Sequence, residues 1–140
     1  MINILLIEDD KDDARLMQEA FRDVQSPNTL QVLEDGEKAV SYLRPLGPVS
    51  KNEKPDLILL DLNLPKLDGF EVLSAIKEDP ALSMIPVIVM STSNSPKDIR
   101  ESYLRRANSY IVKPLNLNEL VEIAHSIEDY WLVRVSLPPQ

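Results

Sequence analysis

Residues 57–60 have the sequence Leu-Ile-Leu-Leu and are followed at once by a carboxylate, Asp61. Four consecutive apolar residues set off by Pro55-Asp56 are typical of a strand that is buried on both faces, as in a parallel sheet. Asp61 would then lie at the carboxyl end of this strand, where open α/β sheets bind their ligands. Because an unpaired carboxylate is costly to bury, we expect other residues of the chain to compensate its charge.

Four further apolar runs are expected to form strands, at residues 4–7, 29–33, 86–90 and 109–112. Segments with apolar residues at helical spacing follow the strands, and the expected helices begin at Asp12 or Asp13, Gly36, Asp68, Ser95 and Asn116. Residues 44–54 contain prolines and a glycine, which predicts a loop longer than most loops in compact domains.

Five strands that alternate with five helices predict an α/β fold with a doubly wound parallel sheet. Right-handed crossovers leave few arrangements, and the flavodoxin-like (βα)5 order 2-1-3-4-5 suits five units of this length. In this order the first, third, fourth and fifth strands are neighbours. Their carboxyl ends carry Glu8-Asp9, Asp61, Ser91 and Lys113. The sequence therefore predicts a cluster of polar side chains at one edge of the sheet.

Length and charge limit the class of protein. The 140 residues suit a single domain, which we expect to span 1–131, with a tail at 132–140 and no effector domain. A net charge of −8 argues against sequence-independent binding to nucleic acid or to an anionic membrane. The chain has no cysteine, no basic leader and no apolar stretch near the roughly 18 residues of a membrane span. These features predict a soluble cytoplasmic domain.

The expected cluster has a composition that points to phosphoryl chemistry. Carboxylates about 4 Å apart repel by about 4 kcal/mol per pair at an effective dielectric of about 20, so Glu8, Asp9 and Asp61 call for a cation. Oxygen ligands select a hard ion such as Mg²⁺. Lys113 supplies a fixed positive charge, the Ser91 hydroxyl can donate to an anionic oxygen, and an aspartate can act as a nucleophile toward phosphorus.

In order and context, Glu8-Asp9, Asp61, Ser91 and Lys113-Pro114 resemble the defining residues of response-regulator receiver domains, and the likeness covers nearly the whole chain. The resemblance implies that a sensor histidine kinase phosphorylates Asp61 in the presence of Mg²⁺. The domain would be no enzyme beyond slow self-dephosphorylation.

The same resemblance assigns roles to individual residues. Asp9 would bind Mg²⁺ directly, Glu8 largely through water, and the backbone carbonyl of Asn63 would complete the protein ligands together with Asp61. Ser91 and Tyr110 would be the residues of the phosphorylation switch. A cis peptide bond between Lys113 and Pro114 would turn the lysine side chain toward Asp61.

Three features that are less specific than the residues above resemble those of the stand-alone receivers that pair with bacterial and cyanobacterial phytochromes. They are the long loop after Arg44, the segment 90–93 and the apolar chain ending at 130–138. This likeness implies a phytochrome as the sensor kinase and a symmetric homodimer in which the last helix and tail pack on the partner. The alternative for the tail is that it folds back over its own body. Output would be a protein contact or a phosphorelay step.

Other functions remain to be weighed against this one. A haloacid-dehalogenase-type phosphatase needs a second aspartate two positions after the nucleophile, where this chain has Asn63. A nucleotide-binding enzyme needs a glycine-rich phosphate loop, and the three glycines do not have that spacing. A receiver-like interaction domain that is never phosphorylated stays open as a third possibility. His125, the single histidine, is expected to be structural or exposed.

Overall fold

The computed structural model describes residues 1–44 and 54–139. The long loop predicted at 44–54 lies outside these residues except for its two ends. The described strands are β1 (Ile2–Ile7), β2 (Asn28–Leu33), β3 (Leu57–Leu60), β4 (Val87–Ser91) and β5 (Ser109–Val112). The described helices are α1 (Lys11–Arg22), α2 (Gly36–Leu43), α3 (Gly69–Glu78), α4 (Pro96–Leu104), α5 (Leu117–Ile127) and the π-helical η1 (Glu128–Arg134).

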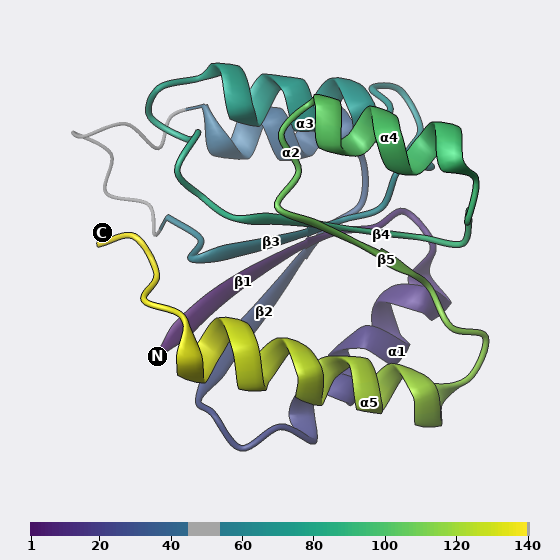
Figure 1. Ribbon diagram of the computed structural model, residues 1–140, viewed down its shortest axis with the longest axis vertical. Coiled ribbons are helices and arrows are strands. Elements are labelled where there is room, and N and C mark those ends of the chain that lie inside the picture. Colours follow the sequence, from purple (N-terminus) through teal and green to yellow (C-terminus); the bar gives the residue numbers. More distant parts are fainter. Residues whose placement is uncertain (45–53, 140) are drawn as a thin grey trace.

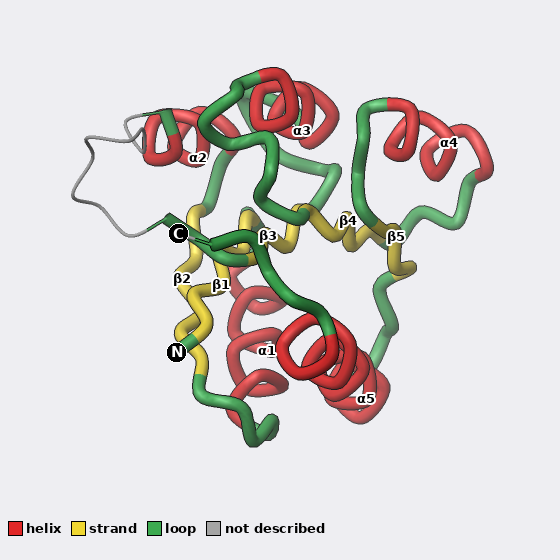
Figure 2. Tube along the Cα trace, turned by 60° about the vertical axis from the view of Figure 1, so that its left-hand side comes forward, coloured by secondary structure: helices red, strands yellow, loops and turns green. Residues whose placement is uncertain are grey.

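The five strands form one parallel sheet in the order β2-β1-β3-β4-β5, as predicted. Helices α1 and α5 cover one face, and α2, α3 and α4 cover the other (Figures 1 and 2). This is the flavodoxin-like arrangement of three layers. Because all strands are parallel, their carboxyl ends meet at a single edge of the sheet.

The central strand explains why the sheet has two cores. Successive side chains of a strand point to opposite faces. Leu57 and Leu59 belong to the core beneath α1 and α5, whereas Ile58 and Leu60 belong to the core beneath α2 and α3. All four are fully buried. Burial of each such side chain stabilises the fold by about 1.5–3 kcal/mol, which is why this strand contains no polar residue.

Side-chain caps fix the beginnings of the helices. Asp68, Ser95 and Asn116 are the predicted N-caps of α3, α4 and α5, and each accepts a hydrogen bond from a backbone N–H three residues later. The prediction for α1 was wrong by two or three residues. Asp10 caps it and accepts from the N–H groups of Asp12 and Asp13, because Asp10 has the extended backbone that a cap requires.

The end of the chain also differs from the expectation. We expected Leu132 and Val133 to lie beyond the last helix, but α5 continues directly into η1, which ends at Arg134. The helix persists because Trp131 and Leu132 pack against the core between α1 and the sheet. The segment after η1 returns to the edge where the strands begin, where Pro138 and Pro139 face Pro55. Within the single chain, these two residues therefore lie beside the loop that precedes β3.

Helices in the described ranges are all too short or too polar to cross a lipid bilayer.

Candidate functional site

Four strands deliver polar residues to one edge of the sheet. Ile7 of β1 is paired with Leu60 of β3, so the next residues, Glu8 and Asp61, lie side by side. The Asp61 N–H donates to the Ile7 carbonyl at 3.0 Å, which continues the ladder by one residue. On the other side, the N–H of Lys113 donates to the carbonyl of Ser91 at 2.7 Å. Backbone pairing therefore brings these residues to the same edge of the sheet.

The carboxylates of Glu8, Asp9 and Asp61 converge at this edge. Each offers one oxygen, and these three oxygens lie within 4.8 Å of one another. Glu8 and Asp61 are buried, whereas Asp9 is exposed. Burial, reinforced by the neighbouring Asp61 carboxylate, raises the pKa of Glu8 to about 8. Ionisation of Glu8 is therefore less favourable here than in water, first because of burial and second because of the nearby Asp61 carboxylate.

Lys113 is the cation that binds this group of acids. Its Nζ lies 2.5 Å from Glu8 Oε1, 3.2 Å from Asp61 Oδ2 and 3.4 Å from Asp13 Oδ2. Burial lowers the pKa of the Lys113 ammonium, but the hydrogen bond to Glu8 and the charges of Asp61 and Asp13 outweigh burial and raise it. Lys113 therefore stays charged. Glu8, Asp9, Asp61 and Lys113 are called the strand-end cluster below.

The contact with Asp13 was missed from the sequence, where Asp13 was interpreted as a helix-start charge. Its position gave a signal, because α1 begins four residues after β1 ends and its first turn faces the same edge. A carboxylate in that turn is also stabilised by the helix dipole. Asp13 thus adds a third acid to the environment of Lys113.

The expectation of a cis bond before Pro114 was wrong. No peptide bond among the described residues is cis, so the bond between Lys113 and Pro114 is trans. A trans bond is the more stable isomer before proline by about 0.5–1 kcal/mol. The lysine side chain still reaches Asp61 at 3.2 Å, so the contact does not need the other isomer.

The two predicted switch residues are connected through Ser93, which sequence reasoning missed. Ser91 is buried, and its Oγ accepts a hydrogen bond from the Ser93 N–H at 3.1 Å. The Tyr110 hydroxyl donates to the Ser93 carbonyl at 2.8 Å. Ser93 Oγ in turn donates to Asp98 in the first turn of α4 at 2.7 Å. The loop between β4 and α4 therefore joins the strand-end cluster to α4.

The loop between β3 and α3 is held close to Asp61. The Asn63 N–H donates to Asp61 Oδ1 at 3.1 Å, and the Gly69 N–H donates to the Leu62 carbonyl at 3.0 Å. A Cβ on Gly69 would lie 2.4 Å from the Cα of Leu62, closer than any side chain can approach backbone. Glycine is therefore required where α3 begins, and the loop stays folded over the end of β3.

The donor atoms at this edge suit a hard divalent cation. Glu8, Asp9 and Asp61 offer carboxylate oxygens that lie close together. The backbone carbonyl of Asn63, two residues after Asp61, is the further ligand that the resemblance implies. An all-oxygen set of this kind suits Mg²⁺ or Mn²⁺ rather than a softer metal. Burial and the neighbouring Asp61 carboxylate raise the pKa of Glu8, and the positive charge of such an ion would favour the ionised form of this carboxyl.

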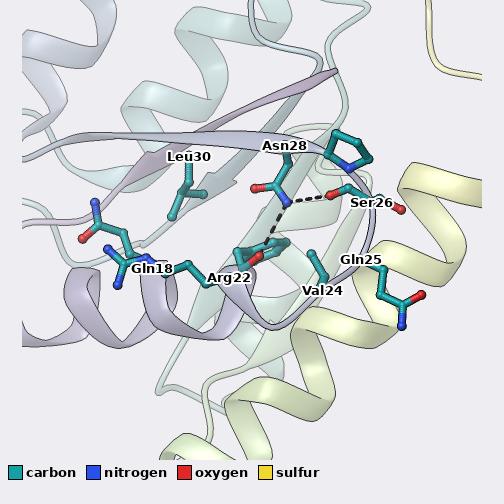
Figure 3. Close-up of a pocket in the computed structure, with 9 residues that line it drawn as sticks. Gln18, Arg22, Val24, Gln25, Ser26, Asn28 and Leu30 are labelled. Carbon is teal, nitrogen blue, oxygen red and sulfur yellow. Dashed lines mark hydrogen bonds between the residues drawn. The ribbon is translucent and has the colours of Figure 1, made fainter.

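A second feature of the surface lies away from this edge. A hollow of about 380 Å³ lies between the end of α1 and the start of β2, and Figure 3 shows the residues that line it. Its polar lining includes Gln18, Arg22 and Asn28 and contains no carboxylate. The Asn28 amide already donates to the carbonyls of Ser26 and Phe21, at 2.9 and 3.5 Å. The hollow belongs to the edge where the strands begin and contributes nothing to the strand-end cluster.

Comparison with known proteins gives consistent results. The family model for the response regulator receiver domain matches residues 4–125. Response regulator Rcp1 of a Synechocystis strain is 44% identical over 135 residues, which cover 96% of this chain and 92% of Rcp1.

Two solved structures cover nearly all of the chain. The phosphorylated cyanobacterial phytochrome response regulator RcpA has a TM-score of 0.91 at 48% identity and covers 99% of both chains. The Mn²⁺-bound form of Rcp1 has a TM-score of 0.89 at 43% identity and covers 99% of this chain and all of that one.

Proposed function

This chain belongs to the response regulator receiver domain family, and on that premise we propose that it accepts a phosphoryl group on Asp61 from the phosphohistidine of a sensor histidine kinase. The observation that carries the proposal is the strand-end cluster itself. A buried aspartate lies beside a charged lysine, and both lie within a group of acids that suits a divalent cation. These are the parts that phosphoryl transfer requires.

The reaction follows from the contacts of Asp61. A carboxylate oxygen of Asp61 forms a bond to phosphorus while the bond from phosphorus to the kinase imidazole breaks. The leaving imidazole nitrogen keeps the electron pair and takes up a proton. Lys113 Nζ, 3.2 Å from Asp61 Oδ2, stabilises the negative charge that spreads over the phosphoryl oxygens. Mg²⁺ held by Glu8, Asp9, Asp61 and the Asn63 carbonyl would supply further positive charge at the same oxygens.

The phosphorylated state would signal through the loop between β4 and α4. The Ser91 hydroxyl, now an acceptor for the Ser93 N–H, would turn to donate to a phosphoryl oxygen. Tyr110 is hydrogen-bonded to the carbonyl of Ser93, so a shift of this loop changes the position of Tyr110 as well. Within α4 only Ser102 is fully buried, which makes this helix easy to move. The result would be a changed protein-binding surface.

A phytochrome is the sensor that we propose for this pathway. The support is the identity of 48% to RcpA, which is described as a phytochrome response regulator, over 99% of both chains. One fold can serve many functions, so the fold does not identify the sensor kinase. This part of the proposal therefore depends on sequence similarity and not on the geometry of the site.

We also propose a symmetric homodimer formed through η1. Tyr130 and Val133 of this segment are exposed although both are large and apolar. Their side chains are therefore available to a second copy, whereas Trp131 and Leu132 pack on their own chain. Light scattering should give a dimer mass for the unchanged protein and a monomer mass for the Val133→Lys variant. A monomer mass for the unchanged protein, with and without phosphorylation, would contradict this arrangement.

The phosphorylation proposal is tested with a small-molecule phosphodonor and Mg²⁺. Intact-mass measurement should show one hydroxylamine-sensitive phosphoryl group on the unchanged protein and none on Asp61→Asn, which keeps the shape and removes the nucleophile. Asp9→Ala should weaken Mg²⁺ binding and labelling together. Persistent labelling of Asp61→Asn would overturn the assignment. Beryllofluoride that fails to bind in the presence of Mg²⁺ would favour the unphosphorylated interaction domain instead.

A further inference from the structure

We propose that the N-terminus of α2 positions the loop between β3 and α3, and through it the Asn63 carbonyl, which the proposed function assigns to the metal. The inference rests on the proposed function, because it assigns Gly36 and Asp35 a part in metal binding and phosphorylation. Neither residue touches Asp61. Both act through residues 62–68, which we call the acceptor loop.

The first observation is a close approach of two backbones. A Cβ on Gly36 would lie 2.0 Å from the carbonyl oxygen of Leu67 and 2.9 Å from its carbonyl carbon. No side chain can occupy that space unless either α2 or the acceptor loop moves away. The requirement for glycine here comes from packing and not from its dihedral angles, since Gly36 has no positive φ. The first residue of α2 therefore rests directly on the acceptor loop.

The second observation is a charge contact at the same place. Asp35, the N-cap of α2, is buried, and its Oδ1 accepts a hydrogen bond from the Lys38 N–H at 2.8 Å. Its other oxygen, Oδ2, lies 3.7 Å from Nζ of Lys66 in the acceptor loop. Lys66 has a φ of 68°, in the left-handed region that lysine rarely adopts. A strained residue of the loop is thus paired with the helix that supports the loop.

The third observation is that α2 cannot easily give way. Ala39 and Leu43 of this helix are fully buried in the core beneath α2 and α3. A side chain added at Gly36 would therefore push the acceptor loop rather than the helix. Helix α2 therefore limits how far the acceptor loop can move toward it.

The acceptor loop transmits such a push to the site because it is short and internally bonded. Both the Leu64 and Gly69 N–H groups donate to the Leu62 carbonyl, at 3.2 and 3.0 Å. The Asn63 N–H donates to Asp61 Oδ1 at 3.1 Å. Displacement of Leu67 therefore has few ways to be absorbed before it reaches Asn63. The expected consequence is a misplaced carbonyl ligand and an altered hydrogen bond to the nucleophile.

The direct test is the binding of Mn²⁺ to Gly36→Ala, measured by titration calorimetry. We expect the affinity to fall about tenfold, as is usual when groups that orient metal ligands are removed. In the metal-free protein, the amide resonances of Asn63 and Asp61 should shift. Saturating Mn²⁺ should restore most of the labelling by a small phosphodonor, because the nucleophile itself is unchanged.

The matched control is Val40→Ala, which shortens a core side chain of the same helix and leaves Gly36 and Asp35 in place. It should lower thermal stability and leave the Mn²⁺ affinity and both amide resonances as they are. If Gly36→Ala does not fold, Asp35→Asn is the second variant. Asparagine keeps the helix cap and loses the charge that pairs with Lys66, so the Asn63 amide resonance should shift in the same direction by a smaller amount.

The outcomes separate this inference from the proposed function. Unchanged Mn²⁺ affinity and unchanged Asn63 and Asp61 resonances in Gly36→Ala would overturn the positioning role, even if the unchanged protein is labelled on Asp61. Equal losses of affinity in Gly36→Ala and Val40→Ala would overturn it as well, because both would then reflect general destabilisation. Failure of the proposed function would instead appear as an unchanged protein that binds Mn²⁺ and accepts no phosphoryl group.

Discussion

An ion pair connects each end of helix α1 to another part of the chain, and the two pairs differ chiefly in how deeply their cations are buried. At its start, Asp13 contacts Lys113, whose side chain is only 10% exposed within the strand-end cluster. At its end, Asp23 lies 2.6 Å from Nε2 of His125, and the imidazole is 43% exposed. Charge pairs in water contribute little, whereas buried charges depend strongly on their partners.

The environments of the two cations reflect this difference. Lys113 has three carboxylates within 3.4 Å, so one positive charge faces three acidic groups. His125 contacts Asp23 and, at 3.5 Å, Glu128, whose second oxygen accepts from the Ser26 N–H. The site around Lys113 is buried and contains more acidic than basic side chains, which suits the binding of a cation and a phosphoryl group. The arrangement around His125 is a surface contact between α1, α5 and η1.

The largest expected effect is the loss of Lys113. Lys113→Met should lower the free energy of unfolding by about 3–5 kcal/mol, because it leaves Glu8 and Asp61 buried together without their cation. Urea denaturation measures the change. Lys38→Met, which removes an exposed ion pair with Glu34, should change the stability little. Equal losses of unfolding free energy in the two variants would contradict the claim that the buried pair matters more than the exposed one.

Addition of Mg²⁺ should produce the next largest change. An ion that binds only the folded protein stabilises it by about 2.7 kcal/mol at a concentration one hundred times its dissociation constant. Thermal unfolding with and without Mg²⁺ measures the gain. The gain should be lost in Asp9→Ala and kept in Asp23→Ala, since Asp23 belongs to the other end of α1. Equal stabilisation of both variants would place the ion elsewhere.

Substitution of Ser91 should have a smaller effect on stability and a distinct effect on the switch. Ser91→Ala removes one hydrogen bond to the Ser93 N–H, which contributes about 1 kcal/mol. Asp61 should still be labelled, but phosphorylation should no longer shift the amide resonances of Tyr110 and α4. The same shifts in the unchanged protein and in Ser91→Ala would show that this hydroxyl does not carry the signal.

The smallest expected effect is the pH dependence at His125. The hydrogen bond and charge of Asp23 raise the pKa of His125 above its ordinary value of about 6.5. A raised pKa in the folded state means that the stabilisation is complete below about pH 6.5 and is lost as the pH rises through the folded-state pKa. Urea denaturation of the unchanged protein and of His125→Gln between pH 5 and 8 should show a difference that shrinks as pH rises. A difference independent of pH would contradict this.

Sequence patterns predicted the sheet better than they predicted the ends of its helices. The run at 57–60 and the other apolar runs predicted the strands, and right-handed crossovers left few orders in which those strands could be arranged. The starts of α3, α4 and α5 were also predicted, from the cap residues Asp68, Ser95 and Asn116. The cap at Asp10 was missed because three acids nearby are equally good caps by type, and only the backbone angles distinguish them. The length of the final helix was missed because Leu132 is held by a tertiary contact.

For the site, the sequence identified residues at the strand ends and missed those that act through contacts. Glu8, Asp61 and Lys113 could be found because parallel strands end at one edge. Asp13 and Ser93 could not be found in the same way, because their importance depends on where a helix turn and a loop place them. The prediction of a cis bond at Lys113–Pro114 was wrong for a related reason. The sequence does not show whether the lysine side chain can contact Asp61 from a trans bond.

The most direct test of the account is transfer from a sensor kinase that carries a labelled phosphoryl group on its histidine. The unchanged protein and Asp61→Asn, distinguished by mass, are mixed with the kinase and Mg²⁺ in one reaction. The account predicts that label moves rapidly to the unchanged protein, that hydroxylamine releases it as expected for an acyl phosphate, that it maps to Asp61, and that Asp61→Asn stays unlabelled. Label that appears on both proteins, or that maps to another residue, would contradict the assignment of Asp61 as the phosphoryl acceptor.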